Sequence, residues 1–547
     1  MKITLLITSF NSLSQAVFCY LKDNGFSVDV VYATSKTRDE EIASFAPELI
    51  LCPFLKHYIP ASIYEVYPTF VYHPGLRGDR GAYSLEWALW EENKEWGGVW
   101  LRAVKELDGG DIYAQGSFDM RQTYKASLYR NEELRNALAL LPPLLQNIQN
   151  NTKTPQLPNP IHPRFSTTIN WEEDDTKTII KKINTLDSFP GVEDEILGLK
   201  CHLFGAWEEE KLKGKSPKEI LAKRDGAICL ATKDGALWVT HLKPKDGFKL
   251  PATYVLKERL KGVKEDRLPL IFDRSYKTFY EISADIKDDV AFLYFNFHNG
   301  AFSSDKCIKL KYAFEYLKSQ VKIIVLMGGQ DFFSNGIHLN ILEDSKKNGE
   351  DGWSNINAMN DLVGSILEAD DVVTIASLEK NAGAGGVFLA LACDFVVASE
   401  SCVLNPHYKT LGLSGSEYHT YTLPKRVGEQ KAKELLEQCL PVSASKAKKL
   451  GMVDAVFSLK DYKNELSDFI ENLFDDADAL EDFLWEKEEY IEANKEQMEV
   501  CKKAELKTMY PEFWEEDSVF HQLRYEFVYK ACPTQTPLRL KYKKNVL

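Results

Sequence analysis

A histidine and an aspartate in the first quarter of the chain stand where α/β enzymes often place their reacting groups. His73 ends the apolar run "TFVYH" (69–73), and a loop with three Gly and two Arg follows it. Asp108 lies further along, in the glycine-containing turn of "VKELDGGDIYAQ" (104–115). Side chains at neighbouring strand ends of a parallel sheet share one crevice, and a carboxylate beside an imidazole orients it for proton transfer. The pair predicts a proton-handling site.

A second set of candidate residues surrounds a glycine-rich turn in "NAGAGGVFLALACDFVVAS" (381–399). Gly385 and Gly386 allow a substrate to approach the backbone, and the apolar helix expected after them adds free N–H groups and a positive dipole end. Such a turn favours the binding of a developing oxyanion. The downstream loop "LSGSEYHTY" (413–421) offers an acid or base, and the sequence does not rank its three candidates, Glu417, Tyr418 and His419.

The elements that must position His73 are predicted from short apolar segments. Segments 3–8 and 27–32 are apolar and β-rich, and a helical pattern at 14–23 separates them. Segments 47–54 and 68–73 read as further buried strands. Strands that alternate with helices predict a mostly parallel sheet.

The rest of the chain predicts three more regions. Residues 141–163 carry six Pro and read as a helix end followed by a linker, and residues 227–243 read as a hairpin around Asp-Gly in a small β-rich unit. Four short strands separated by helices predict another α/β unit, at 288–297, 321–329, 372–378 and 394–399. From about residue 476 the chain is charged, aromatic and helical in pattern.

We therefore predict a multidomain α/β fold. Its predicted domains are 1–165, 166–275, 285–475 and a helical tail at 476–547. The net charge of −14 argues against binding to nucleic acid or to an anionic membrane surface.

The ten Cys form no C-x-x-C pair, which predicts free thiols in the cytoplasm and no metal site. The start, "MKITLLITSFNSLSQ", reads as a first strand and not as a signal peptide. No apolar run approaches the roughly 20 residues that span a membrane.

The pattern around His73 resembles the folate-dependent formyltransferases that act on glycinamide ribonucleotide and methionyl-tRNA. "VYHPG…RG…LDGGDI" is similar to the family's Asn-x-His, Arg-Gly and Asp-x-Gly-x-Ile. The resemblance implies that His73 stabilises the tetrahedral oxyanion, that Asp108 manages protons, and that 10-formyltetrahydrofolate is the donor. Val71 stands where the family has Asn. Either another donor replaces that carboxamide, or the formyl acceptor is not the usual amine.

Three more segments resemble the formyltransferases. "TSFNSLSQ" (8–15) is similar to their phosphate loop, which implies an anion site formed by Ser9, Asn11, Ser12 and Gln15. "CPFLKHYIP" (52–60) resembles their folate pocket, which implies a pterin site lined by Phe54, Leu55 and Lys56. The second unit resembles the C-terminal region of the methionyl-tRNA enzyme, on the evidence of Trp171, Pro190 and Gly191.

The second half resembles the enoyl-CoA hydratase/isomerase (crotonase) superfamily. The resemblance rests on four ordered segments, at 296–304, 328–342, 381–399 and 423–428. It implies coenzyme A as a ligand, an oxyanion hole made by the N–H groups of Ile337 and Gly385, and Gly336 and Gly386 beside the ligand. Phe388 and His407 stand where hydratases carry their two Glu, so ordinary hydration is not expected, and His407 is a further candidate acid or base.

A formyltransferase-like half, a crotonase-like half and a helical tail together resemble the HypX (HoxX) family of hydrogenase maturation factors. This resemblance implies an enzyme that makes the carbon monoxide ligand of the [NiFe]-hydrogenase iron. The implied route is formyl transfer from 10-formyltetrahydrofolate to coenzyme A, followed by decarbonylation of formyl-CoA in the crotonase-like domain. The implied protein partners are hydrogenase maturation proteins or the large-subunit precursor.

Three alternatives stay open. The chain could be an amine formyltransferase whose crotonase-like half only binds a nucleotide. It could be a non-catalytic maturation scaffold. It could also be a plain enoyl-CoA hydratase or isomerase, although Phe388 and His407 argue against that reading.

Overall fold

Residues 1–543 are described by a computed structural model, in which the chain divides into two units. The first unit contains residues 1–267, 273–279 and the segment that begins at Cys532, and the second contains residues 268–272 and 280–531. The chain therefore passes four times from one unit to the other, at 267/268, 272/273, 279/280 and 531/532. The four domains predicted from the sequence divide the chain more finely, and their boundaries stay predictions.

The first unit begins with a mixed six-stranded sheet in the order β2-β1-β3-β4-β5-β6. Its strands are β1 (Lys2–Ile7), β2 (Ser27–Tyr32), β3 (Leu49–Cys52), β4 (Thr69–His73), β5 (Glu95–Arg102) and β6 (Ile112–Asp119). The four strands β2-β1-β3-β4 run parallel, as the sequence predicted, and β5 and β6 are antiparallel to their neighbours. The parallel strands are buried along almost their whole length, which explains why they read as continuous apolar runs.

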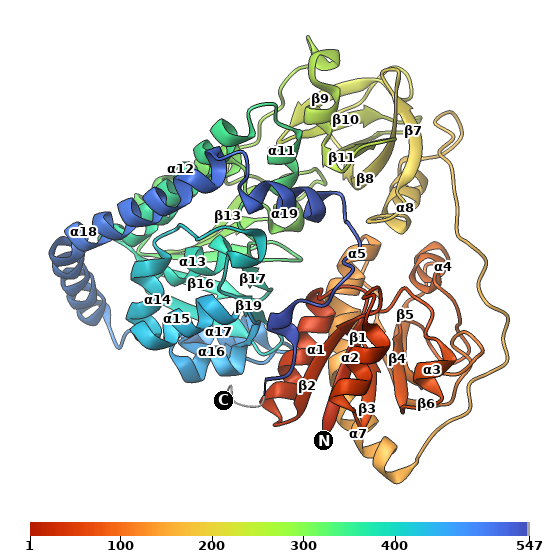
Figure 1. Cartoon of the computed structure of the whole chain (residues 1–547). Helices are drawn as coiled ribbons and strands as arrows, with labels where there is room; N and C mark the ends of the chain where they lie inside the picture. The colour runs from red at the N-terminus through yellow and green to blue at the C-terminus, as the bar shows by residue number, and fades with distance from the viewer. Residues whose placement is uncertain (544–547) are drawn as a thin grey trace. The chain divides into compact units, whose positions relative to one another are not determined.

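Helices connect and cover these strands (Figure 1). They are α1 (Ser12–Asp23), α2 (Arg38–Phe45), α3 (Ala61–Tyr64), α4 (Ser84–Trp90), α5 (Lys125–Leu128), α6 (Leu134–Ala139) and α7 (Leu141–Asn150), with a π-helical turn η1 (Tyr129–Glu133) before α6. An extended linker without regular helix or strand follows α7, as the Pro-rich composition predicted.

A second, antiparallel sheet completes most of the first unit, in the order β7-β8-β11-β10-β9. Its strands are β7 (Val192–Ile196), β8 (Leu199–Glu209), β9 (Ile220–Arg224), β10 (Ala227–Ala231), β11 (Ala236–Pro244) and β12 (Leu250–Pro251), accompanied by α8 (Thr176–Thr185), α9 (Ala252–Leu256) and the turn η2 (Lys257–Leu260). The predicted hairpin is confirmed, because β10 and β11 pair across the Asp-Gly turn. Ile179 and Ile183 of α8 are fully buried against this sheet.

The second unit contains a six-stranded sheet and a small three-stranded one, in the orders β13-β14-β15-β16-β18-β21 and β17-β19-β20. The strands are β13 (Ile282–Lys287), β14 (Val290–Phe295), β15 (Ile323–Gly328), β16 (Val373–Leu378), β17 (Ala382–Gly383), β18 (Phe395–Ser399), β19 (Val403–Asn405), β20 (Val442–Ser443) and β21 (Ala455–Phe457). The four strands predicted here are β14, β15, β16 and β18, and they lie side by side and parallel.

Helices alternate with these strands. They are α10 (Ser304–Lys318), α11 (Leu339–Asp344), α12 (Asn348–Leu367), α13 (Gly385–Leu391), α14 (His419–Val427), α15 (Glu429–Gln438), α16 (Ala444–Leu450) and α17 (Tyr462–Glu471), with short turns η3 (His298–Gly300) and η4 (Lys409–Leu411). The predicted α/β fold class is therefore confirmed in both units.

Two helices near the C-terminus cover the second unit. The long helix α18 (Ala477–Trp514) runs beside α12, and α19 (Val519–Val528) packs on α11 (Figure 1). The buried side chains of α18 lie at helical spacing, and they are Met498, Glu505, Met509 and Phe513. Such a stripe faces the protein interior, yet this one contains a carboxylate.

The segment after α19 belongs to the first unit and follows the edge strand β2. Pro533 and Thr534 accept hydrogen bonds from Thr34 and Lys36, and Thr536 accepts one from the Tyr32 N–H. The turn η5 (Leu538–Leu540) follows. Among residues 1–543, no helix is both long and apolar enough to cross a membrane.

Candidate functional site

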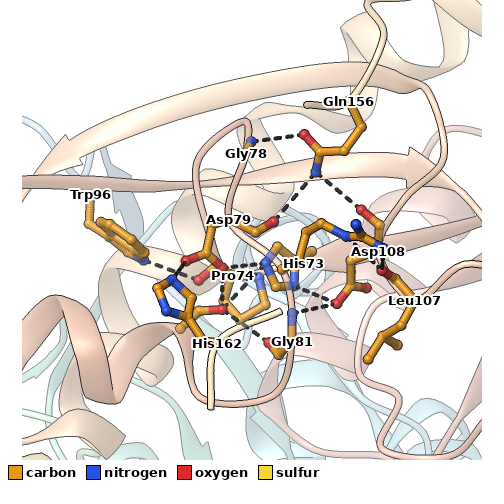
Figure 2. A network of polar contacts seen from close by, with 12 residues as sticks. His73, Pro74, Gly78, Asp79, Gly81, Trp96, Leu107, Asp108, Gln156 and His162 are labelled. Carbon is orange, nitrogen blue, oxygen red and sulfur yellow. Dashed lines mark hydrogen bonds and ion pairs between the residues drawn. The ribbon is translucent and has the colours of Figure 1, made fainter. Parts of the chain in front are cut away.

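His73 lies at the end of β4 with its side chain almost fully buried between two carboxylates (Figure 2). Its Nε2 lies 2.7 Å from Oδ1 of Asp79, and its Nδ1 lies 3.5 Å from Oδ2 of Asp108. The structure therefore brings the predicted pair together and adds a second carboxylate. The Ser84 hydroxyl, at the start of α4, lies 3.3 Å from the same Nε2 and donates to Asp79.

The loop after β4 is shaped around this contact. A Cβ atom built on Gly75 would lie 2.4 Å from Oδ1 of Asp79 and 2.7 Å from Nε2 of His73, so a larger residue would push these two groups apart. The Gly81 N–H donates to Oδ2 of Asp108 at 2.9 Å. Asp108 comes from the loop between two antiparallel strands, with a φ of 50°, and not from the end of a parallel strand.

The linker after α7 closes one side of this cluster. His162 places Nε2 2.9 Å from Oδ2 of Asp79, and its ring stacks on Trp87 (Figure 2 shows the ion pair). Gln156 donates to the carbonyl oxygens of Asp108 and Asp79 and accepts from the Gly78 N–H. The linker thus supplies two polar side chains to the site. Its Pro-rich composition did not predict this contribution.

The charge of Asp79 is set by these neighbours. Burial alone would raise the pKa of the Asp79 carboxyl, but hydrogen bonds from His73 and Ser84 and the nearby charges of His73 and His162 hold it below its usual value. A carboxylate therefore lies against Nε2 at neutral pH. It fixes the orientation of the imidazole ring and accepts its N–H.

Val71 occupies the position of the family's asparagine and has an apolar environment. It lies two residues before His73, on the same face of β4, and packs against Val99, Leu101 and Ile112. A carboxamide here would place polar atoms in an apolar cluster. The polar atoms nearest His73 come instead from Asp79, Ser84 and Asp108.

The predicted anion loop and the predicted pterin segment are neighbours. The Thr8 N–H donates to the carbonyl of Phe54, and the Lys56 N–H donates to the Thr8 hydroxyl. Asn11 caps α1 by accepting from the Ser14 N–H at 3.0 Å, and Gln15 donates to the carbonyl of Phe10. Two of the four predicted side chains therefore hold the loop in shape.

Ser9 is exposed, Ser12 is half-buried, and Phe54 and Leu55 are half-buried beside them. Phe54 makes an edge contact with Tyr129, and the Lys56 ammonium lies 5.5 Å from the Phe54 ring centre. Arg539, which the sequence did not single out, lies over the Phe10 ring at 5.9 Å and adds a cation beside this loop. These side chains suit a ligand with an aromatic ring and an anionic group.

The second cluster is built where two loops of the second unit meet. The Gly383 N–H donates to the carbonyl of Ser334, and a Cβ atom on Gly386 would lie 2.3 Å from that same carbonyl oxygen. A Cβ atom on Gly336 would lie 3.2 Å from the Gly385 nitrogen. The glycines at 336 and 386 are therefore needed for this close approach.

The two predicted oxyanion donors meet here. Phe302 exchanges hydrogen bonds with Gly336 and His338, so the Ile337 N–H between them points the other way. Within the described part of the chain, the N–H groups of Ile337 and Gly385 have no hydrogen-bond acceptor. Two adjacent N–H donors without acceptors are what an oxyanion hole requires.

A buried carboxyl group lies beside Gly385. A Cβ atom on Gly385 would lie 2.8 Å from Cδ and 2.9 Å from Oε1 of Glu417, whose side chain is 1% exposed. The Tyr408 hydroxyl donates to Oε2 of Glu417 at 2.6 Å, and Asn360 accepts from the Glu417 N–H at 2.8 Å. Burial raises the pKa of Glu417 to about 7, although the Tyr408 hydrogen bond opposes the shift.

The other predicted residues of this site have different surroundings. Phe388 stacks on Tyr408, and His419 makes edge contacts with both rings. Tyr418 points to α12 and α18, where its hydroxyl lies beside Gly364. His407 is half-buried, two residues after the end of β19. Of Glu417, Tyr418 and His419, the structure places Glu417 against Gly385.

Sequence reasoning missed several residues of these clusters, and Asp79, His162 and Tyr408 show why. Asp79 was only one of several charges in a loop, His162 lay in a Pro-rich linker, and Tyr408 was one of many aromatics. The only sequence signal for Tyr408 was its place after Pro406 and His407, where the hydratase carboxylate was sought.

Comparisons with known proteins define the class. The formyl transferase C-terminal domain family matches residues 165–259, and the enoyl-CoA hydratase/isomerase family matches residues 288–528. A peroxisomal fatty acid beta-oxidation multifunctional protein of Oryza sativa is 31% identical over 155 residues, which are 28% of this chain and 21% of that protein. The chain thus joins formyltransferase and crotonase-like domains.

Relatives that span the whole chain narrow this class to one family. The hydrogenase maturation factor HoxX of Bradyrhizobium diazoefficiens is 35% identical over 99% of this chain and 97% of its own length. The crystal structure of HypX from Aquifex aeolicus in complex with tetrahydrofolic acid matches with a TM-score of 0.96 and 40% identity, over 100% of this chain and 99% of that one. The chain belongs to the HypX/HoxX family of hydrogenase maturation factors.

Proposed function

We propose that the chain makes carbon monoxide for the iron of [NiFe]-hydrogenase from 10-formyltetrahydrofolate. The first cluster transfers the formyl group to the thiol of coenzyme A, and the second releases carbon monoxide from the formyl thioester. The observation that carries the proposal is the buried Glu417 beside the two N–H donors, in a domain where Phe388 replaces a hydratase carboxylate. Family membership and the folate complex of the Aquifex relative support it.

The formyl transfer breaks the bond from the formyl carbon to folate nitrogen and forms a bond from that carbon to sulfur. The thiol proton moves to the folate nitrogen, so no oxidant or reductant is needed. His73 donates the N–H of its Nδ1 to the formyl oxygen, with Asp108 3.5 Å from Nδ1, and Asp79 holds the imidazole in place by accepting the N–H of Nε2. Phe54, Leu55 and Lys56 line the pterin side, and Ser9, Ser12 and Arg539 lie where an anionic group of the acceptor would bind.

The second reaction removes the formyl proton and breaks the carbon–sulfur bond, which gives carbon monoxide and the free thiol. The Ile337 and Gly385 N–H groups orient and polarise the thioester carbonyl. Glu417 accepts the formyl proton and returns it to the leaving sulfur. A pKa of about 7 suits both steps, because the carboxyl exchanges protons readily near neutral pH. Phe388 and Tyr408 keep water from the thioester, which disfavours hydrolysis.

The proposal also assigns a cellular compartment and a protein partner. The cysteines of the described chain are free thiols, and eight are buried, which fits a reducing cytoplasm. The partner is the hydrogenase large-subunit precursor or a maturation protein bound to it, because the gas must reach an iron centre.

The test is an incubation of the purified chain with carbon-labelled formyl-folate and coenzyme A. We expect labelled carbon monoxide, and we expect none from the Glu417→Gln variant. Labelled formyl-amine without carbon monoxide would indicate an ordinary formyltransferase. Full hydrogenase maturation by a His73→Ala, Asp108→Ala double variant would indicate a scaffold, and hydration of crotonyl-CoA would indicate a plain hydratase.

A further inference from the structure

The segment that carries Glu417 has an unfavourable backbone conformation. Glu417 and Tyr418 are consecutive non-glycine residues with φ of 61° and 56°. Residues with side chains rarely adopt this left-handed region, and they keep it only where the surrounding structure imposes it. Some part of the second unit must therefore hold residues 414–420 in place.

Two carboxylates of α18 hold the 414–420 segment. Glu505, 3% exposed, accepts from the N–H of Tyr418 at 3.0 Å and from the N–H of Thr420 at 2.7 Å. The Thr420 hydroxyl also donates to it, and its Oε1 lies 3.2 Å from Nδ1 of His419. Glu512 accepts from the N–H of Ser414 at 2.9 Å. The two glutamates are two helical turns apart, so they face the same way.

The Glu505 carboxylate accepts from the N–H groups of Tyr418 and Thr420, the residues on either side of His419, and this set of bonds is specific to one conformation of the loop. Glu505 lies in the otherwise apolar stripe of α18. If this helix only covered the core, an apolar side chain would suit that position better. A buried carboxylate is costly unless its oxygens are satisfied, and Glu505 satisfies them with loop donors alone.

We propose that Glu505 and Glu512 are positioning residues of the second site, which hold the 414–420 segment so that the Glu417 carboxyl faces Gly385. This inference rests on the role given to Glu417 in the proposed function. The titratable groups that face Glu417 are Tyr408 and His419, Glu505 of α18 and Cys307 of α10. The negative charge of Glu505 adds to the burial that raises the pKa of Glu417.

The test compares Glu505→Gln with a matched change elsewhere on the same helix. Lys487 anchors α18 to Asp394 at 2.6 Å and does not contact the loop, so Lys487→Gln weakens the helix attachment without touching residues 414–420. We expect Glu505→Gln to lower kcat for carbon monoxide release from formyl-CoA about 10- to 100-fold with KM little changed. We expect its pH–rate midpoint to move below that of the parent chain, because a nearby negative charge is lost. Lys487→Gln lowers thermal stability and leaves kcat and the midpoint unchanged.

Two readouts do not depend on activity. Infrared titration of the carboxyl band that disappears in Glu417→Gln reports the pKa of Glu417 directly, and it should fall in Glu505→Gln. Hydrogen exchange at the Tyr418 and Thr420 amides should accelerate in Glu505→Gln, and exchange at Ser414 in Glu512→Gln. If the parent chain releases no carbon monoxide but these shifts occur, the proposed function fails and the positioning role stands. If Glu505→Gln behaves as Lys487→Gln does in all measurements, the positioning role is wrong.

Discussion

At the scale of single residues, Glu417 has two effects. Its buried carboxyl suits proton transfer, and it also lowers the stability of the folded chain at neutral pH. Its pKa is raised from 4.5 to about 7. A raised folded-state pKa gives stabilisation that is complete below the unfolded value and lost as the pH rises through the folded value. The fold therefore becomes less stable from about pH 4.5 to pH 7 because of this one group.

The first prediction concerns Glu417→Gln. Between pH 5 and pH 8 the free energy of unfolding of the variant should gain about 3 kcal/mol relative to the parent chain, since the amide never ionises. Denaturant unfolding at several pH values measures this difference, and carbon monoxide release should be lost at every pH. Parallel stability curves for the two proteins would show that Glu417 titrates normally.

The second prediction concerns Asp79, the carboxylate at Nε2 of His73. Asp79→Asn should lower kcat for formyl transfer by about 100-fold, which is the lower range for loss of a positioned proton-transfer group. The KM for formyl-folate should change little, because Asp79 contacts His73 and not the pterin segment. His162→Gln is the control, since it removes only the outer ion pair and should cost less than about 10-fold. An equal loss of kcat in both variants would contradict the prediction that Asp79 matters more than His162 for formyl transfer.

At the scale of elements, strand β4 shows how the fold accommodates the missing asparagine. Val71 packs with Val99 and Leu101 of β5 and with Ile112 of β6. Val71→Asn should therefore destabilise the chain by about 1 kcal/mol, because the amide of this half-buried residue finds no partner in the apolar cluster. It should not create transfer to amines. Thermal unfolding and an amine formylation assay check both parts, and a gain of amine transfer would show that the strand tolerates the ordinary family mechanism.

The sequence predicted elements better than it predicted contacts. Apolar runs such as β14 to β16 and glycine turns such as 383–386 are local patterns, so their structure follows from neighbouring residues. The contact between Asp79 and His162 depends instead on the path of an irregular linker, and that of Glu505 with residues 418–420 on the packing of a distant helix. Charged residues in such places look solvent-exposed from the sequence alone, which is why Asp79 and Glu505 were missed.

The C-terminal helices α18 and α19 contact both segments of the second site, the one that carries Glu417 and the one that carries Ile337. Glu505 and Glu512 of α18 bind the segment with Glu417, and Arg524 of α19 pairs with Glu343 of α11 at 2.7 Å, directly after the Ile337 loop. The aromatic, charged composition of the tail is thus explained by packing and by these bonds.

At the scale of the whole molecule, the two clusters belong to different units, and their reactions should be separable. His73→Ala should abolish formyl transfer but still release carbon monoxide from added formyl-CoA. Gly386→Ala should do the reverse, because a Cβ atom there collides with the Ser334 carbonyl in the second unit. Assaying each half-reaction with its own substrate measures this separation.

Mixing these two variants tests how the formyl group travels. We expect the mixture, given formyl-folate and excess coenzyme A, to form labelled carbon monoxide at a rate that rises with protein concentration. Such behaviour requires a carrier that leaves one molecule and enters another. No gas from the mixture, with both half-reactions intact, would show that the carrier never leaves the chain.

The last described residues of the chain lie on β2, the strand at the open edge of the first sheet. Lys541 pairs with Asp29 and Glu41, and the Tyr542 N–H donates to the buried Asp29 carboxylate at 2.7 Å. Dividing the gene at any single linker would leave these two acids without their cation and β2 without its cover, an exposed edge that invites aggregation. Anyone who wishes to study the formyl-transferring half alone must therefore supply residues 532–543 as a separate peptide or fuse them back.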